Sequence, residues 1–287
     1  MAAQDKSQGG PATTGHEWDG IREYDNPLPR WWLWVFYACI LWAIGYWIVM
    51  PAWPLISSHT KGVIGYSQRA SVERQLERNR QAQSVFVERI KQASLADIRK
   101  DQELLSFATA GGRSAFAVNC SQCHGSGAQG AKGYPNLNDD AWLWGGKLED
   151  ISYTIANGIR NGGDGARDSA MPAFGRDEIL EPGQIADLVE YVVSLSGRPA
   201  TAVAAERGAA LFKEQCVACH GDDGKGKQEF GAPNLTDTIW LYGGDRASVR
   251  ESIHGSRRGV MPAWKDRLSP ETIKQLTVFV HSLGGGK

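Results

Sequence analysis

Four of the five cysteines in this chain belong to two copies of one pentapeptide, Cys-x-x-Cys-His. The first copy is Cys120-Ser-Gln-Cys123-His124 and the second is Cys216-Val-Ala-Cys219-His220. This spacing is the attachment signature of a c-type haem, because two sulfurs one helical turn apart can each bond a vinyl group while the adjacent histidine binds the iron. Zinc ribbons also use Cys-x-x-Cys pairs, but they need neither that histidine nor a methionine downstream. The motifs therefore predict two covalently bound haem c groups.

Two methionines occupy matching positions downstream of these motifs. Met171 and Met261 each open a Met-Pro-Ala sequence, 47 residues after His124 and 41 residues after His220. Methionine often serves only as adaptable core filling, but packing does not explain two that share both sequence and position. We therefore expect each iron to be held by the histidine and the methionine of its own repeat. A thioether opposite an imidazole raises the reduction potential, and two filled axial positions suit an electron carrier rather than an oxygen-binding centre.

The two motifs lie within an internal repeat with a period of about 96 residues (216 minus 120), which predicts two domains of one fold. Gly112 and Gly208 should let the first helix of each copy pack closely against its last helix, at Tyr191 or Phe279. Each copy is expected to be helical, with an amphipathic segment before the motif and an apolar helix face near its end: residues 106–119 and 185–195 in the first copy, 204–215 and 273–283 in the second.

Further residues could shape the haem pockets. The two copies resemble the small helical fold of class I cytochromes c, in which a prolyl carbonyl at this distance after the motif accepts the ring N–H of the iron-binding histidine. The resemblance implies this role for Pro135 and Pro233, with an ordinary loop proline as the alternative. His254 and His281 are expected to be structural or exposed. Candidate pocket-wall aromatics and propionate partners are Trp142, Trp144, Trp240, Tyr242, Arg160, Arg257 and Arg258, but the arginines could equally be solvated on the surface.

One uncharged run of twenty residues, Trp31 to Met50, is long enough for a bilayer-spanning helix. Tryptophans at both ends resemble aromatic interface belts, and no small-residue cleavage site follows that would indicate a removed signal peptide. Cys39, the fifth cysteine, is expected to be an apolar filler of this span. Basic residues on both sides leave the orientation open. Because bacteria attach haem covalently outside the cytoplasm, we expect the haem domains in the periplasm and the N-terminal tail in the cytoplasm.

The stretch from residue 67 to residue 102 is rich in arginine, glutamate and glutamine. Pairs such as Glu77 with Arg80 would face each other on a helix, so a solvated helical connector is expected, with a docking surface for a membrane partner as the alternative. The chain carries 31 basic and 32 acidic residues, a net charge of −1. This balance gives no reason to expect a nucleic-acid partner.

Residues 18–34, just before and into the span, resemble the start of the di-haem subunit (subunit III) of cbb3-type cytochrome c oxidases. The likeness covers essentially the whole chain, including both Met-Pro-Ala sites. It implies an all-α protein with one N-terminal transmembrane helix, a helical connector and two tandem class I cytochrome c domains. The expected boundaries are 1–30 for the cytoplasmic tail, 31–56 for the anchor, 57–105 for the connector, and 106–199 and 200–287 for the two domains.

This resemblance also implies a function. Such a subunit of a bacterial inner-membrane oxidase takes electrons from cytochrome c or the bc complex and passes them to the mono-haem subunit and then to the haem–copper catalytic subunit. Oxygen reduction belongs to that catalytic subunit. A tethered cytochrome that serves a periplasmic dehydrogenase would show the same haem motifs. A di-haem peroxidase needs an open iron, which the two Met-Pro-Ala sites disfavour.

Overall fold

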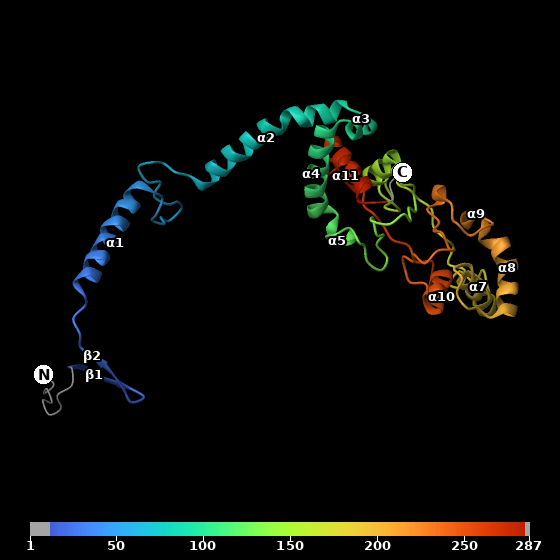
Figure 1. Cartoon of the computed structure of the whole chain (residues 1–287), viewed down its shortest axis with the longest axis horizontal. Coiled ribbons are helices and arrows are strands. Elements are labelled where there is room, and N and C mark those ends of the chain that lie inside the picture. Colours follow the sequence, from blue (N-terminus) through green and yellow to red (C-terminus); the bar gives the residue numbers. More distant parts are fainter. Residues whose placement is uncertain (1–11, 285–287) are drawn as a thin grey trace. The chain divides into compact units, whose positions relative to one another are not determined.

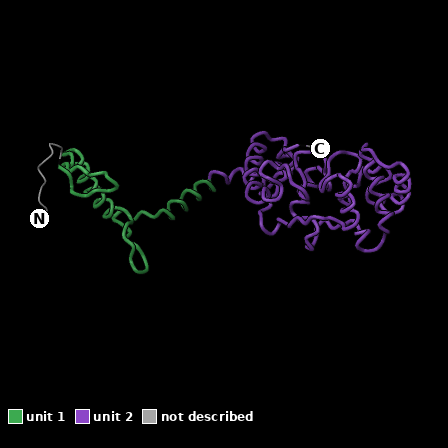
Figure 2. Tube along the Cα trace, turned by 90° about the horizontal axis from the view of Figure 1, so that it is seen from below, with its two compact units in different colours: residues 1–81 green, residues 82–287 purple. Residues whose placement is uncertain are grey.

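A computed structural model describes residues 12–284 and confirms the all-α architecture with one apolar N-terminal helix (Figure 1). The chain divides into two compact units, residues 1–81 and 82–287 (Figure 2). Helix α2 (Gln68–Gln92) contributes residues to both units.

A small antiparallel hairpin lies within the expected N-terminal tail, where no strand was predicted. Strand β1 (Thr13–Trp18) pairs with β2 (Ile21–Tyr24), and Glu17 opposes Arg22 in an ion pair of 2.7 Å. The connecting residues Asp19 and Gly20 both have positive φ, 46° and 83°, as a type I′ turn requires. An Asp-Gly pair is itself a sequence signal for such a turn.

Helix α1 (Arg30–Val49) forms the predicted span and is long and apolar enough to cross a membrane. None of its residues is buried within the protein, and Cys39 is exposed on it. The chain then folds back on the end of this helix, where the amides of Val63 and Ile64 donate to the carbonyls of Ile48 and Val49 (3.0 and 3.2 Å). These bonds satisfy two of the carbonyls that a helix end leaves without partners.

The connector is helical, as expected, and its far end is buried. Glu77 and Arg80 lie 3.8 Å apart on α2, so the expected charge pair is present. Beyond α2, the short helix α3 (Leu95–Lys100) turns the chain back. Ile90 of α2 and Ile98 of α3 are fully buried against Val278 near the C-terminus. The end of the connector therefore belongs to the core of the second unit.

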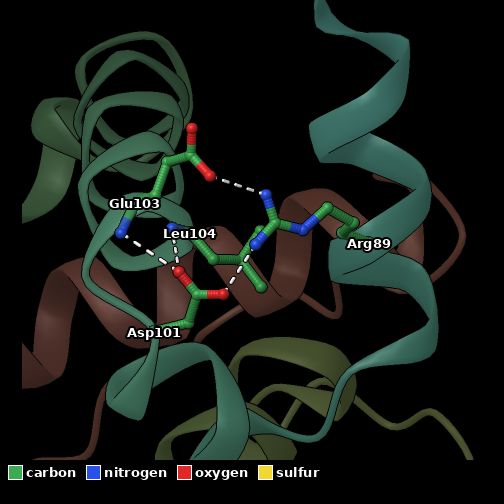
Figure 3. A network of polar contacts seen from close by, with 4 residues as sticks. All are labelled: Arg89, Asp101, Glu103 and Leu104. Atoms are coloured by element: carbon green, nitrogen blue, oxygen red, sulfur yellow. Dashed lines mark hydrogen bonds and ion pairs between the residues drawn. The ribbon is translucent and has the colours of Figure 1, made fainter.

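Arg89 fixes the corner between α2 and α4 (Figure 3). Its guanidinium donates to the carboxylates of Asp101 (2.6 Å) and Glu103 (2.8 Å). Asp101 is also the N-cap of α4, because its other oxygen accepts from the backbone amides of Glu103 and Leu104. One carboxylate thus satisfies two otherwise unpaired helix amides and an arginine at the same time.

The rest of the second unit contains two hydrophobic cores. Core A is the cluster around Phe116, Ile151 and Phe279, and core B is the cluster around Val189, Phe212 and Ile253. The longer helices of core A are α4 (Gln102–Asn119), α6 (Leu148–Asn157) and α11 (Pro270–Leu283); those of core B are α7 (Pro182–Leu195), α8 (Ala202–Gln215) and α10 (Arg246–Gly255).

These cores do not coincide with the two repeats. Helix α4, from the first repeat, packs on α11, from the second, while α7 packs on α8 (Figure 1). The expected boundary between residues 199 and 200 therefore falls inside core B. The physical reason is the short connection between α7 and α8, residues 196–201, which favours a helical hairpin of sequence neighbours.

The two glycines expected at the helix contacts are indeed there, but with exchanged partners. A Cβ on Gly112 would meet the Gln275 carbonyl and lie 2.6 Å from the Phe279 Cβ, while a Cβ on Gly208 would meet the backbone of Asp187 and lie 2.8 Å from the Tyr191 Cβ. Because both repeats carry the same pattern of first and last helices, either pairing satisfies the pattern, and the period alone cannot distinguish them.

Candidate haem sites

Each Cys-x-x-Cys-His motif forms a single helical turn at the end of a longer helix. The turns are α5 (Ser121–His124), after α4, and α9 (Val217–His220), after α8. In the first turn the amides of Cys123 and His124 donate to the carbonyl of Cys120 (3.1 and 3.0 Å), and the second motif repeats this pattern. The helical backbone places the two sulfurs of each motif one turn apart, which is the arrangement that two thioether bonds need.

Both motif histidines are oriented by a prolyl carbonyl. The Nδ1 atom of His124 lies 3.0 Å from the Pro135 carbonyl oxygen, and His220 Nδ1 lies 3.1 Å from that of Pro233. A carbonyl only accepts hydrogen bonds, so Nδ1 carries the proton in each ring and Nε2 keeps its lone pair. The rings are therefore fixed in the tautomer that binds a metal through Nε2, with the proline carbonyl as the second partner.

Burial supports this protonation state. Removal from water lowers the pKa of His124 and of His220, and the hydrogen bond to the proline carbonyl opposes the shift only partly. Burial, with a smaller effect of the second thiol, raises the pKa of Cys120 and of Cys216 to about 11. Neutral imidazoles and uncharged sulfurs suit an apolar, covalently held porphyrin better than a thiolate-bound zinc.

The two methionines lie with the motif of the opposite repeat. Met171 packs on core B and lines a cavity together with Cys216, Cys219 and His220. Met261 packs on core A, the cluster that also contacts Cys120. The expected pairing of each methionine with the histidine of its own repeat is thus not what the structure shows, and the exchange follows from the exchange of helices.

The chain segments that lead to Met171 and to Met261 are joined to each other by hydrogen bonds. Ile159 and Met261 exchange backbone hydrogen bonds of 3.0 and 2.9 Å. The side chain of Arg160 donates to the carbonyls of Gly259 and Ser169, both at 2.8 Å, and so ties the approach to one methionine to the approach to the other. Sequence reasoning considered Arg160 only as a propionate partner or a solvated residue.

Buried N–H groups without a protein partner indicate whether these pockets suit a haem. Among the described residues, the buried Nε1 atoms of Trp142, Trp144 and Trp240 have no hydrogen-bond partner. Buried donors are nearly always satisfied. Trp142 packs on core A and Trp240 on core B, so the N–H groups of these two residues fit the carboxylates of a bound haem. The cavity of core B is also lined by other candidates from the sequence, namely Arg160, Trp240, Tyr242, Arg257 and Arg258. The residues present therefore fit haem at this site.

Two arginines that lie over candidate aromatic residues were missed by sequence reasoning. Arg198 stacks on Trp240 at 5.5 Å and donates to the Gly244 carbonyl, while Arg167 lies over Trp144 at 5.4 Å. Arg198 carries no motif signal, whereas Arg167 stands four residues before Met171, as Arg257 does before Met261. The two remaining histidines were expected to be structural or exposed: His254 is exposed on α10, and His281 is buried on α11.

Known proteins share this organisation along the whole chain. Family models match residues 10–57 (N-terminal domain of cytochrome oxidase-cbb3, FixP), 109–196 (cytochrome c) and 203–280 (cytochrome C oxidase, cbb3-type, subunit III). A cbb3-type cytochrome c oxidase subunit FixP from Azorhizobium caulinodans is 55% identical over 97% of this chain and 95% of its own length. The subunit CcoP from Cereibacter sphaeroides is 53% identical over 97% of both chains.

The chain belongs to the FixP/CcoP family of cbb3-type oxidase subunits. A third relative, the CcoP subunit of Azospirillum brasilense, is 50% identical over the full length of both chains. The family resemblance expected from residues 18–34 is thus confirmed, and the match to the N-terminal family model extends it through the apolar helix. Helix α1 fits a membrane anchor.

Proposed function

We propose that this chain is the membrane-anchored di-haem electron-transfer subunit of a cbb3-type terminal oxidase. The observation that carries the proposal is the pair of sites in which a Cys-x-x-Cys-His turn, a prolyl carbonyl and a methionine converge on one core. When bound, each haem supplies reversible one-electron chemistry at a potential raised by thioether ligation. The protein residues hold the ring orientation and exclude water.

In this proposal the axial ligands are exchanged between the repeats. Cys120 and Cys123 attach one haem, which is held by His124 and Met261. The other haem is attached at Cys216 and Cys219 and held by His220 and Met171, the residues that line one cavity. Pro135 and Pro233 orient the histidines, and a carbonyl that accepts the ring N–H makes the opposite nitrogen a stronger ligand.

Chains that carry a single haem separate the exchanged pairing from the pairing within repeats. With Cys120 and Cys123 both changed to alanine, Met171→His should lower the potential of the remaining haem, whereas Met261→His should leave it unchanged. With Cys216 and Cys219 changed instead, Met261→His should lower the potential of the remaining haem and Met171→His should leave it unchanged. A pyridine haemochrome assay verifies that one haem is retained. If Met261→His shifted the haem at Cys216, the exchanged pairing would be refuted.

Assembly and orientation complete the proposal. The relatives are named as subunits of cbb3-type cytochrome c oxidase, and we place this chain between cytochrome c or the bc complex, as donor, and the mono-haem and haem–copper subunits, as acceptors. Haem attachment outside the bacterial cytoplasm puts the haem cores in the periplasm of the inner membrane and the tail in the cytoplasm. Protease added to spheroplasts should remove both cores and spare α1.

Purification in mild detergent tests the oxidase assignment. The tagged chain should bring down a haem–copper subunit and a mono-haem c subunit in fixed ratio. A periplasmic dehydrogenase in their place would support the second candidate, a tethered carrier for a dehydrogenase. The match of residues 10–57 to the N-terminal domain of cbb3 oxidase subunits favours the oxidase, because a bare tether needs no specific tail.

A further inference from the structure

Two aromatic residues each contact a glycine of the other core: one reaches from core A to core B, and the other from core B to core A. Trp144 and Tyr242 occupy equivalent repeat positions, each between a leucine and a pair of glycines. The indole of Trp144 lies directly against Gly231, while the ring of Tyr242 lies 3.2 Å from where a Cβ on Gly133 would stand. Gly133 and Gly231 are equivalent as well, because each precedes by two residues the proline that orients a motif histidine.

Each aromatic ring also has an arginine over it. Arg167 lies over Trp144 at 5.4 Å, and Arg257 lies over Tyr242 at 4.9 Å. Both arginines stand four residues before a Met-Pro-Ala sequence. Arg167 is itself anchored on core A by a hydrogen bond to Thr154 (2.9 Å). A cation over the ring face and a glycine against the ring leave each aromatic little freedom.

The crossing is a packed contact beside an open space. Trp144 is only 7% exposed, and the Gly133 amide donates to the Leu241 carbonyl at 2.8 Å. Leu143, next to Trp144, already lines the cavity that contains His220 and Met171. Next to the contact, residues of both cores line a separate cavity of about 750 Å³. At this face the two rings and the Gly133–Leu241 hydrogen bond join the cores.

We propose that Trp144 and Tyr242 are positioning residues that hold the two haem-binding cores together and set the rate of electron exchange between them. The inference rests on the proposed function. An electron that crosses leaves one iron oxidised and the other reduced, and no bond or proton changes. Exchange of this kind falls steeply with the gap between the cores, so the residues that close the gap control it. Neither ring has to be oxidised.

The experiment uses the full-length, haem-loaded chain in detergent. Trp144→Leu removes the ring, and Gly231→Ala pushes against the same ring from the opposite core. Gly231 has a φ of +62°, so alanine there also strains the backbone. Gly197→Ala is the matched control, because Gly197 has a φ of +73° and no atom lies within 4 Å of where its Cβ would stand. The first readout is relaxation between the haems after one is photoreduced, and the second is hydrogen exchange at the Gly133 amide.

We expect Trp144→Leu and Gly231→Ala to slow the relaxation several-fold and to speed exchange at Gly133. In Trp144→Leu both haem potentials should stay unchanged, because Trp144 does not line the cavity that contains His220 and Met171. Gly197→Ala should do neither, and Trp144→Phe should restore most of the rate. An unchanged rate in Trp144→Leu and Gly231→Ala, with both haems retained, would overturn the inference while leaving the proposed function intact. If the unaltered chain itself failed to load two haems, the proposed function would fail instead.

Discussion

Gly112 lies where helices α4 and α11 meet backbone to backbone, and its neighbour Gly111 does not. A Cβ on Gly112 would collide with the backbone carbonyl of Gln275, which cannot move without the helix. A Cβ on Gly111 would meet only the end of the Gln275 side chain, 2.7 Å from its Oε1, which can rotate away. The helix contact therefore requires glycine at position 112, whereas position 111 can accept a larger side chain.

We predict opposite effects for alanine at these two positions. Gly112→Ala should lower the free energy of unfolding by about 1–3 kcal/mol, the usual cost of overpacking. Gly111→Ala should be neutral or stabilising by up to about 1 kcal/mol, because alanine is the better helix former. Denaturant titration of the haem-loaded chain measures both. Equal losses at the two positions would show that α4 and α11 do not cross at Gly112.

Glu190 of α7 gathers three segments of core B and gives this core a pH dependence. Its carboxylate accepts from the Arg246 guanidinium (2.6 Å) and from the Thr201 amide (2.7 Å). The bonds to Arg246, and then that to Thr201, lower the pKa of Glu190 to about 2. A carboxyl with a depressed folded-state pKa stabilises the fold above its unfolded pKa, about 4.3, and loses that contribution as the pH falls toward 2.

We predict that Glu190→Gln destabilises core B at pH 7 and that the difference from the unaltered chain shrinks between pH 4.5 and pH 2. Glutamine keeps the size of the side chain and removes the charge that Arg246 pairs with. Glu206→Gln, on the exposed side of α8, serves as the control. Thermal midpoints across this pH range provide the measurement. A difference that did not vary with pH would mean that Glu190 acts through packing alone.

At the scale of elements, the C-terminal helix α11 holds the end of the connector. Lys274 donates three hydrogen bonds, to the carbonyls of Ile90 (3.0 Å), Lys91 (2.9 Å) and Ala93 (2.7 Å). These carbonyls lie at and just beyond the C-terminal end of α2, where a cation is favoured both by unpaired oxygens and by the helix dipole. One lysine of the second repeat thus caps the C-terminal end of α2, a helix that precedes the first repeat in the chain.

Lys274→Met should loosen this junction and leave both haem sites loaded. Methionine preserves the apolar stem of the side chain but removes the three donors, so amides in residues 88–93 should exchange with solvent faster. Lys213→Met, at an exposed position on α8, is the control. Hydrogen exchange resolved by peptide provides the measurement. Unchanged protection in residues 88–93 would mean that the apolar contacts of Ile90 and Ile98 suffice to hold the connector.

The sequence predicted the elements better than their partners. Apolar periodicity placed helices at residues 185–195 and 273–283, and the motifs located the turns of His124 and His220. It could not place Met171 in the site of the other repeat, because matched repeats satisfy the same pattern whether or not their last helices are exchanged. The hairpin at residues 13–24 was not predicted, although the sequence contains its Asp-Gly turn. Two short strands before an apolar span look like a linker in the sequence.

At the scale of the whole molecule, the two cores differ in how the chain builds them. The residues that the structure assigns to core B all lie between Met171 and Ile253, in one continuous stretch. Core A is built from two stretches, one before residue 160 and one after residue 260. Core B is thus inserted into core A, and its methionine precedes its histidine in the chain. Helix α7 and its short connection to α8 lie wholly inside the inserted stretch.

We predict that residues 168–258, exported to the periplasm of a host that attaches haem c, fold as a single-haem protein with both axial ligands. The fragment contains the Cys216 motif, Met171 and all of the α7–α8–α10 packing. The second repeat alone, residues 200–287, has the same motif but lacks Met171 and α7, so its haem should be poorly held and should lack the thioether-to-iron charge-transfer band in the near infrared. The band, haem content and thermal midpoint of the two fragments provide the comparison. A well-folded fragment 200–287 with that band, beside an unfolded fragment 168–258, would restore the boundary between the repeats as the boundary between the domains.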